Sequence, residues 1–401
     1  MKTLTLALER DESFEKISAA IDQGRCPALL SGTGALPRAH AVSALRLRRQ
    51  APIVAVLSDE GEAKKFSEDL SSFTGEEVLG LFGRDFIFYN AEVVSREGER
   101  RRLAAFERLL SGECGLVVTT PDALMQRTMP PEIFSRLSTR LKSGGTADIG
   151  EIAARLTEAG YVRSAQTEGP GQFSVRGGIL DVFSPAAELP FRMEFFGDEI
   201  DSMAYFDPAS QRRTENVDEA LILPVQEAPL TAADGGRDGL LARLDAYGKK
   251  LLRRKNVSRE LTQSVAQDMA RIREGRSLPA TDRYLDLMFA PATAADYIPP
   301  EAIVVLCEPG RLEDRAKGYV WQLSEDLTAL AEKGVFEGQA ERLITPWDKV
   351  IERLEDFPII MMAAFTTSAL PVRPRAMETQ SSKQLPSYGG SLETAASDIK
   401  H

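Results

Sequence analysis

Residues 53–82 read IVAVLSDEGEAKKFSEDLSSFTGEEVLGLF, a short apolar run followed by an amphipathic stretch and a second apolar run. The spacing predicts a buried strand over residues 53–57, a helix over 60–73 and another strand over 78–82. Strands that alternate with helices indicate a parallel sheet covered on both faces, as in nucleotide-binding α/β domains. The alternation extends to further predicted strands and helices, which cover residues 28–30, 116–119, 38–47 and 96–110.

A different pattern follows the polar, glycine-containing stretch at residues 142–148. A predicted helix over 149–159 leads into strand-rich sequence over 161–206, where turn residues separate short β runs. We interpret this block as a small α+β domain inserted into the first one. The apolar residues 220–224 are expected to form one more strand that returns to the first sheet.

The sequence after this block is mainly helical. Residues 239–275 and 311–333 have the apolar spacing of helices, with Leu240, Leu244, Tyr247 and Leu251 on one face of the first segment. Two short apolar runs interrupt the helical pattern and are predicted as strands, residues 285–289 and 302–307.

The C-terminal part changes texture after Phe365, where proline and serine become frequent. Residues 392–401 have a helix-like pattern with no stop signal, so we expect a piece of a longer protein. The predicted division has a first domain, an inserted domain, a second mainly helical subdomain, and a linker with the start of a further domain. Their ranges are 1–137 with 205–225, 138–204, 226–345 and 346–401.

Composition excludes several classes of protein. The longest apolar stretch, residues 357–365, has nine residues, whereas a membrane-spanning helix needs about 20. Three distant cysteines and two histidines give neither a disulfide framework nor metal-ligand spacing, and no signal peptide begins the chain. We therefore expect a cytoplasmic protein with no membrane partner.

Charge argues against a protein whose main role is to bind DNA, because the net charge is −11 and phosphate contacts dominate such affinity. Basic clusters occur at residues 46–49, 100–102 and 253–255, each within a helical pattern. They fit either solvated helix faces or local contacts with nucleic acid.

Two stretches in the inserted block are the most informative, GQFSVRGGILDVF at residues 171–183 and PFRMEFFGDEI at 190–200. Strand side chains alternate between faces, so Arg176, Arg192 and Phe196 are expected on one outer surface of a small sheet. Arginine and aromatic residues are enriched at the energetic centres of protein interfaces. The alternative is a surface arginine pair with Phe196 tucked under a loop.

This segment closely resembles the second domain of the nucleotide-excision-repair helicase UvrB and the equivalent domain of the transcription-repair coupling factor family. The matching motifs are FSVRGGILDVF, RMEFFGDEIDS and FDP followed by SQR, and a looser resemblance covers nearly the whole chain. In both families this domain docks the damage-recognition protein UvrA. The resemblance implies that Arg176, Arg192 and Phe196 contact UvrA.

The nucleotide loop departs from the UvrB pattern. A P-loop, G-x-x-x-x-G-K-[ST], uses its lysine to neutralise phosphates and its hydroxyl to reach magnesium. Alignment of residues 31–38, SGTGALPR, with the UvrB motif puts Pro37 at the lysine and Arg38 at the Ser/Thr position. Proline has neither the charge nor the N–H. The glycines remain, so anion binding at the start of the following helix stays an alternative.

Two further departures follow. Residues 296–308, DYIPPEAIVVLCE, resemble the Walker B strand of UvrB, but Cys307 replaces the aspartate, which leaves Glu308 without its oxygen partner for magnesium. UvrB also carries a long aromatic hairpin that probes damage. Residues 88–92 occupy its place here, and the short stretch before the helix near Arg96 leaves no room for it.

A degenerate nucleotide site without a hairpin resembles the UvrB-like module of the transcription-repair coupling factor family. The implied fold is a degenerate P-loop, RecA- or helicase-like parallel-sheet domain with an inserted small α+β domain and a second, mainly helical α/β subdomain. The implied role is non-catalytic recruitment of UvrA, with no cofactor or metal in this segment.

The resemblance also implies properties of a longer protein. In that family an ATP- and magnesium-dependent motor translocates on DNA and displaces stalled RNA polymerase through regions absent here, and a C-terminal domain masks the UvrA surface. Two other classes stay open: a divergent UvrB-like ATPase acting on damaged DNA, and a DNA-binding module.

Overall fold

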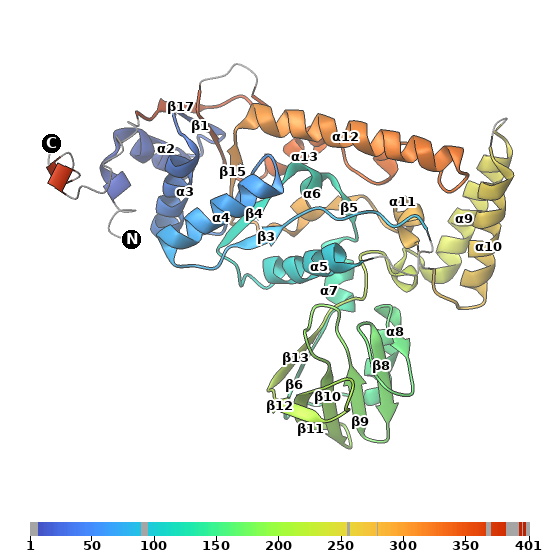
Figure 1. Cartoon of the computed structure of the whole chain (residues 1–401). Helices are drawn as coiled ribbons and strands as arrows, with labels where there is room; N and C mark the ends of the chain where they lie inside the picture. The colour runs from blue at the N-terminus through green and yellow to red at the C-terminus, as the bar shows by residue number, and fades with distance from the viewer. Residues whose placement is uncertain are drawn as a thin grey trace.

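The large body of the molecule is built on a parallel sheet (Figure 1). The computed structural model describes residues 7–89, 95–254, 257–278, 280–365, 370–381, 393–394 and 396–397. Within these residues a seven-stranded sheet has the order β17-β1-β16-β15-β2-β4-β3, and all its strand pairs are parallel. Its strands are β1 (Ala28–Ser31), β2 (Ile53–Val56), β3 (Leu79–Leu81), β4 (Leu116–Thr119), β15 (Ile303–Cys307), β16 (Ile359–Ala363) and β17 (Ala376–Thr379).

Helices cover both faces of this sheet, as its buried strands require. Alternate residues of β2 enter different cores: Ile53 packs with the core on one face, and Val54 with the core on the other. The first core contains residues of α2 (Glu12–Asp22), α3 (Ala35–Arg49) and α4 (Glu60–Thr74). The second contains residues of α5 (Glu97–Leu110), α6 (Pro121–Met125), α12 (Pro309–Glu332) and α13 (Trp347–Leu354). The α/β class predicted from the sequence is confirmed.

The centre of the sheet corrects the predicted division of the chain. The strand at residues 302–307 was expected in a second subdomain, and residues after 346 in a linker. Instead β15 and β16 lie side by side in the middle of the large sheet, with β17 at its edge. A fully buried apolar run has no feature that reveals its neighbours, so strand order could not be predicted from this sequence.

A smaller unit lies below the large sheet in Figure 1. In the described part of the chain it contains a six-stranded sheet of order β12-β11-β10-β9-β8-β7, with α8 beside it. Its elements, with the preceding helix, are α7 (Pro131–Leu137), β6 (Thr139–Lys142), α8 (Ile149–Glu158), β7 (Val162–Arg163), β8 (Gln172–Arg176), β9 (Ile179–Val182), β10 (Phe191–Phe196), β11 (Glu199–Phe206), β12 (Arg213–Asn216) and β13 (Glu219–Ile222).

The expectation that residues 220–224 return to the first sheet is wrong. The strand forms, but β13 pairs antiparallel with β6 and stays with the small unit. Ala220 and Ile222 are buried while Glu219 and Leu221 are only partly buried. This one-sided alternation is typical of an antiparallel pair, whereas strands of the large sheet are buried on both faces.

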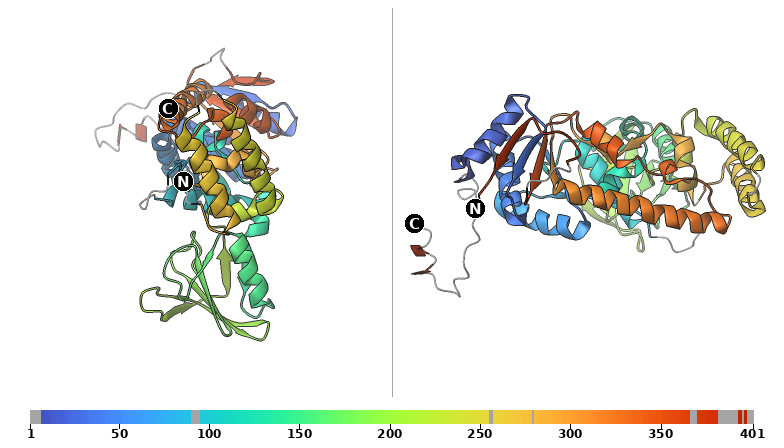
Figure 2. Two further views of the ribbon diagram at one scale, coloured as in Figure 1. Left: turned by 90° about the vertical axis from the view of Figure 1, so that its right-hand side faces the viewer. Right: turned by 90° about the horizontal axis from the view of Figure 1, so that it is seen from above.

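The third part is a helical region at one end of the molecule, where α9 and α10 form a hairpin near the C-terminal end of α12 (Figures 1 and 2). The strand predicted over residues 285–289 is wrong, because Leu285–Met288 forms a short helix, α11. A short segment with four apolar residues and one aspartate fits either element. The remaining elements are η1 (Ala7–Arg10), β5 (Arg127–Thr128), η2 (Leu230–Ala232), α9 (Gly236–Leu252), α10 (Arg259–Arg273), η3 (Thr281–Tyr284), β14 (Ala292–Thr293), η4 (Ala294–Tyr297) and η5 (Ala340–Arg342).

A buried ionic cluster joins the three parts. Arg84, after β3, donates to both oxygens of Asp282 in η3 at 2.7 Å. Glu227, on the segment that leaves the small unit, accepts from Arg84 Nε at 3.0 Å and from Arg102 Nε at 2.9 Å. Because these charges are buried, each needs its partner, and the cluster fixes where the small unit leaves the large one. No helix in the described residues is long and apolar enough to span a membrane.

Candidate partner-docking surface

Two tight turns lie together at one end of the small sheet. Gly177–Gly178 joins β8 to β9, and Gly197–Asp198 joins β10 to β11. Since β9 pairs antiparallel with both β8 and β10, the two turns lie at the same end of these strands. Phe195 N donates to Gly178 O at 2.7 Å. Gly177 and Gly197 both have positive φ, at 60° and 62°, which only glycine adopts without strain. We call this end of the sheet the hairpin end, defined by residues 176–179 and 195–199.

Phe196 projects from the hairpin end into solvent. It is the last residue of β10 and is 83% exposed, so the alternative in which it lies under a loop is excluded. Its neighbours on the other face of the strand, Phe191 and Met193, are buried in the core. An exposed phenylalanine at the tip of an ordered hairpin is a rigid apolar contact of the kind that interfaces use.

Arg176 and Arg192 converge on one buried carboxylate. Asp181 Oδ2 lies 2.6 Å from Arg176 Nη2 and 2.9 Å from Arg192 Nη2, and its Oδ1 lies 2.7 Å from Arg192 Nε. The register pairs Arg192 with Asp181 and Asp181 with Ser174, two residues before Arg176. The two arginines and the carboxylate therefore share one face of the sheet, as strand alternation predicts for the arginines.

The two arginines differ in exposure. The Arg176 side chain is 40% exposed, whereas that of Arg192 is 12% exposed. Arg192 also donates to the carbonyl of Gln211 at 2.8 Å and lies over the Phe206 ring at 4.5 Å. The hydrogen bond to Asp181 raises the pKa of the Arg192 guanidinium. The accessible surface therefore consists of Phe196 and the outer part of Arg176, with Arg192 supporting them.

Asp181 was missed by reasoning from the sequence, although it stands inside the motif GGILDVF. The sequence does contain a signal for it. Asp181 is a single acidic residue between apolar strand residues, and alternation along the strand places it on the same face as Arg192 of the neighbouring antiparallel strand. A buried carboxylate in such a strand requires a cationic partner.

A bulge in β11 keeps the hairpin in register with its core. Glu194 pairs with Ser202 and Phe195 pairs with Ile200, so Asp201 is an extra residue. In a regular strand Ile200 and Met203, three residues apart, would point to opposite faces; with Asp201 bulged out, both are buried in the core. The extra residue is on β11, so β10 keeps its alternation and Phe196 lies on the face opposite Phe195.

The nucleotide-loop residues contact other parts of the chain. Arg38 Nη1 lies 3.0 Å from Glu308 Oε1, and Ala364 N donates to the same oxygen at 2.9 Å. The ion pair joins the two positions that were aligned with the P-loop hydroxyl and the Walker B acid. A side chain at Gly32 would lie 2.1 Å from the carbonyl oxygen of Gln380, so the segment after β17 packs directly on the loop.

Neither Pro37 nor Cys307 is placed to hold magnesium and phosphate. Pro37 lies in the first turn of α3, and Cys307 is buried, with burial raising its pKa to about 12. The thiol is therefore neutral at physiological pH and differs from the oxygen ligands that magnesium prefers. Among the described residues, no group of three or more His, Cys, Asp or Glu side chains could hold a metal ion.

The segment expected at the position of the UvrB hairpin is described only in part. Phe88 packs against Phe336 with ring centroids 5.2 Å apart, and Tyr89 is half-exposed. Asn90, Ala91 and Glu92, which were expected to replace the hairpin, lie outside the described residues. The helix expected near Arg96 begins at Glu97.

Comparison with known proteins agrees with this geometry. Residues 139–227 match the family model described as the UvrB interaction domain. The transcription-repair-coupling factor of Bacillus subtilis (strain 168) is 26% identical over 100% of this chain and 34% of its own length. The protein of that name from Myxococcus xanthus is 30% identical over 79% of this chain and 26% of its own length.

Two facts follow from these matches. The chain spans about a third of the length of the curated relatives that it matches over its whole extent, and it corresponds to their N-terminal portion. The resemblance to the UvrB-like module of transcription-repair-coupling factors is confirmed.

Proposed function

We propose, for a chain similar over its whole length to the N-terminal portion of transcription-repair-coupling factors, that it recruits UvrA during transcription-coupled nucleotide excision repair. The observation that carries this proposal is the exposed Phe196 beside Arg176, at the hairpin end of the unit that matches the UvrB interaction domain. The identity of the partner as UvrA rests on the resemblance to the family. Such a role belongs to the bacterial cytoplasm.

The energetics of the hairpin end support a docking role. Strand pairing already fixes the backbone at Phe196, so little backbone entropy is lost when a partner covers the ring. Arg176 is held by Asp181 and still exposes part of its guanidinium for a partner's carboxylate or carbonyl. An exposed aromatic ring and an arginine at the same end of one sheet are the residue types that interface hot spots favour.

We infer that this module does not hydrolyse ATP. Pro37 and Cys307 stand where the UvrB motifs place the phosphate-binding lysine and the magnesium-binding aspartate. The Arg38–Glu308 ion pair joins these motif positions and supports a structural role for both. Release of phosphate from ATP by the purified chain would contradict this inference and favour a divergent UvrB-like ATPase.

The remaining activities of the relatives are proposed to lie outside this chain. ATP-driven translocation on DNA and displacement of RNA polymerase would use regions beyond the third that is present here. In the complete protein a C-terminal domain would cover the hairpin end until the motor engages, so that UvrA docking is gated.

Hydrogen exchange tests the location of docking. Backbone amides of residues 174–181 and 191–200 are expected to exchange more slowly when UvrA is added to the purified chain, because the partner covers both hairpins. Protection confined to another part of the molecule, such as α12 and α13, would place the docking site elsewhere and reject the proposal.

A further inference from the structure

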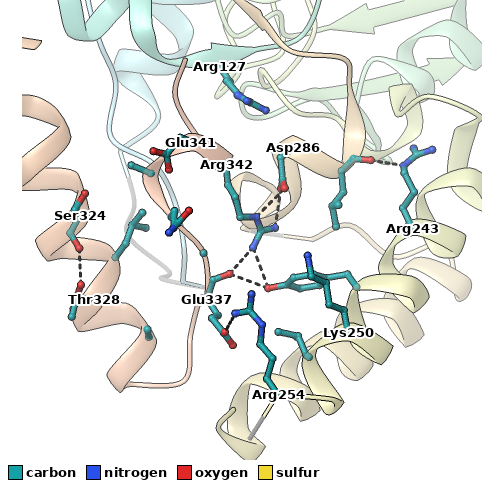
Figure 3. Close-up of a pocket in the computed structure, with 18 of the residues that line it drawn as sticks. Arg127, Arg243, Lys250, Arg254, Asp286, Ser324, Thr328, Glu337, Glu341 and Arg342 are labelled. Atoms are coloured by element: carbon teal, nitrogen blue, oxygen red, sulfur yellow. Dashed lines mark hydrogen bonds and ion pairs between the residues drawn. The ribbon is translucent and has the colours of Figure 1, made fainter. Parts of the chain in front are cut away.

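A cavity of about 1190 Å³ lies outside the hairpin end, in the helical part of the molecule (Figure 3). One wall is the face of α9 from Arg243 to Leu251, with Arg254 just beyond the helix, and the opposite wall is α12 around Ser324 and Thr328. The segment from Glu337 to Arg342 and the short helix α11 complete the lining. No catalytic or docking role described above uses this cavity.

The lining is basic in a chain whose net charge is −11. Its cationic residues outnumber its carboxylates by five to three. The cations are Arg127, Arg243, Lys250, Arg254 and Arg342. The carboxylates are Asp286, Glu337 and Glu341. An excess of positive charge inside a concavity attracts anions more strongly than the same charges on an open surface.

Arg342 is held rigidly at the centre of the cavity (Figure 3). Its Nε and Nη2 donate to the carboxylate of Asp286 at 2.9 and 2.8 Å, and its Nη1 lies 3.1 Å from the Tyr247 hydroxyl. Its guanidinium carbon lies 4.8 Å from the ring centroids of both Tyr247 and Phe336. Asp286 is thereby paired with Arg342 and Glu337 with Arg254, while Glu341, the third carboxylate of the lining, is exposed and forms no ion pair with a described residue.

Arg127 is a cation of the lining that no described carboxylate contacts directly. Its side chain points into the cavity (Figure 3), is partly buried, and has no hydrogen bond or ion pair with any residue the structure describes. Burial lowers the pKa of this guanidinium, and the attraction of the nearby Asp286 and Glu341 carboxylates offsets that effect only in part. Such a group lowers the stability of the protein unless an anion joins it.

Two more cations lack a carboxylate. Arg243 donates to the carbonyl oxygens of Leu287 and Asp234 at 2.5 and 2.6 Å, and Lys250 forms no ion pair within the described part of the chain. Both lie on α9, seven residues apart and about 10 Å along the helix axis at 1.5 Å per residue, and Arg254 follows just after the helix ends at Leu252. A row of cations fits a ligand whose negative charges repeat along its length.

We propose that this cavity binds the phosphate backbone of a short single-stranded nucleic acid, with Arg127 as its central phosphate contact. The volume exceeds the roughly 300–1,000 Å³ typical of small-molecule sites, which favours an oligonucleotide over a mononucleotide. Arginine presents a planar fork of donors that matches phosphate oxygens. Binding here is independent of UvrA docking at the hairpin end.

The test uses the full chain and a fluorescently labelled single-stranded dT 12-mer, with affinity measured by anisotropy at several salt concentrations. We expect saturable binding that weakens as salt increases. Arg127→Met should lower the affinity at least about tenfold, as loss of a charge-assisted phosphate contact does. The same substitution should raise Tm without DNA, because it removes a cation that has no partner. A role confined to holding the fold would instead lower Tm.

Controls separate the cavity from general charge effects. Arg101→Met removes an exposed arginine of α5 outside the cavity and should change neither affinity nor Tm. Lys250→Glu, at an exposed position on α9, should also weaken binding. This variant provides the test if Arg127→Met does not fold. The proposal is overturned if the dT 12-mer does not bind, if Arg127→Met binds it normally, or if ATP or a polyglutamate peptide displaces it at equal concentration. UvrA affinity of Arg127→Met should equal that of the unmodified chain.

Discussion

Asp181 is buried, and its carboxylate holds the arginines of the hairpin end in place. Strand alternation predicted that Arg176, Arg192 and Phe196 share a face, and they do. Alternation could not predict how far each side chain reaches solvent, because Arg192 is covered by Gln211 and Phe206, which come from elsewhere in the fold. The odd or even position of a residue along its strand determines which face its side chain is on, whereas tertiary contacts determine how exposed that side chain is.

Substitution of Asp181 by alanine tests this support. Arg192 would remain largely buried without its anion, so the free energy of unfolding should fall by about 3–5 kcal/mol, as for other buried pairs broken from one side. Urea unfolding followed by circular dichroism measures the change. Glu194→Ala is the matched control, because Glu194 pairs with Arg213 on the exposed part of the same sheet and should cost about 1 kcal/mol or less. Equal losses in both variants would contradict the supporting role of Asp181.

At the scale of elements, the sequence predicted the strands β1, β2, β3, β4 and β15 and the helices around them, because long helical spacing and fully buried runs are strong signals. It failed for residues 285–289, where four apolar residues around Asp286 suit a helix or a strand. It also failed to place β13 and β16, since pairing partners are chosen by distant segments. In the candidate site, the motif GGILDVF held the signal for Asp181, whereas the basic cavity depends on segments far apart in sequence.

The junction between elements gives a prediction about pH. Glu99 of α5 accepts from Glu227 N at 2.8 Å, and burial raises the pKa of its carboxyl above the ordinary value of 4.5. The folded state therefore binds a proton more tightly than the unfolded state, so this residue's contribution to stability decreases as pH rises from about 4.5 through the folded-state pKa.

Glu99→Gln removes that titration while keeping an oxygen that can accept from Glu227 N. The difference in unfolding free energy, variant minus unmodified chain, should rise with pH through this window and then level off. Chemical denaturation at a series of pH values measures the difference. A difference that is constant with pH, or that falls, would show that Glu99 does not titrate in this manner.

At the scale of the whole molecule, a parallel-sheet body keeps the outline of a nucleotide-binding domain, while its exposed binding features lie elsewhere. The small unit carries the hairpin end, and the helical end carries the basic cavity (Figures 1 and 3). The cluster of Arg84, Arg102, Glu227 and Asp282 connects these parts through buried charges. Such a body is suited to hold a docking surface at a fixed position.

The affinity of UvrA for the chain with Phe196→Ala tests the central claim most directly. Titration calorimetry should show a loss of about 1–3 kcal/mol in binding free energy, with an unchanged Tm because the ring is exposed. Phe365→Ala is the matched control, since Phe365 is also 83% exposed and lies outside the small unit, and it should bind UvrA like the unmodified chain. Undiminished binding by Phe196→Ala, or an equal loss in both variants, would contradict the account.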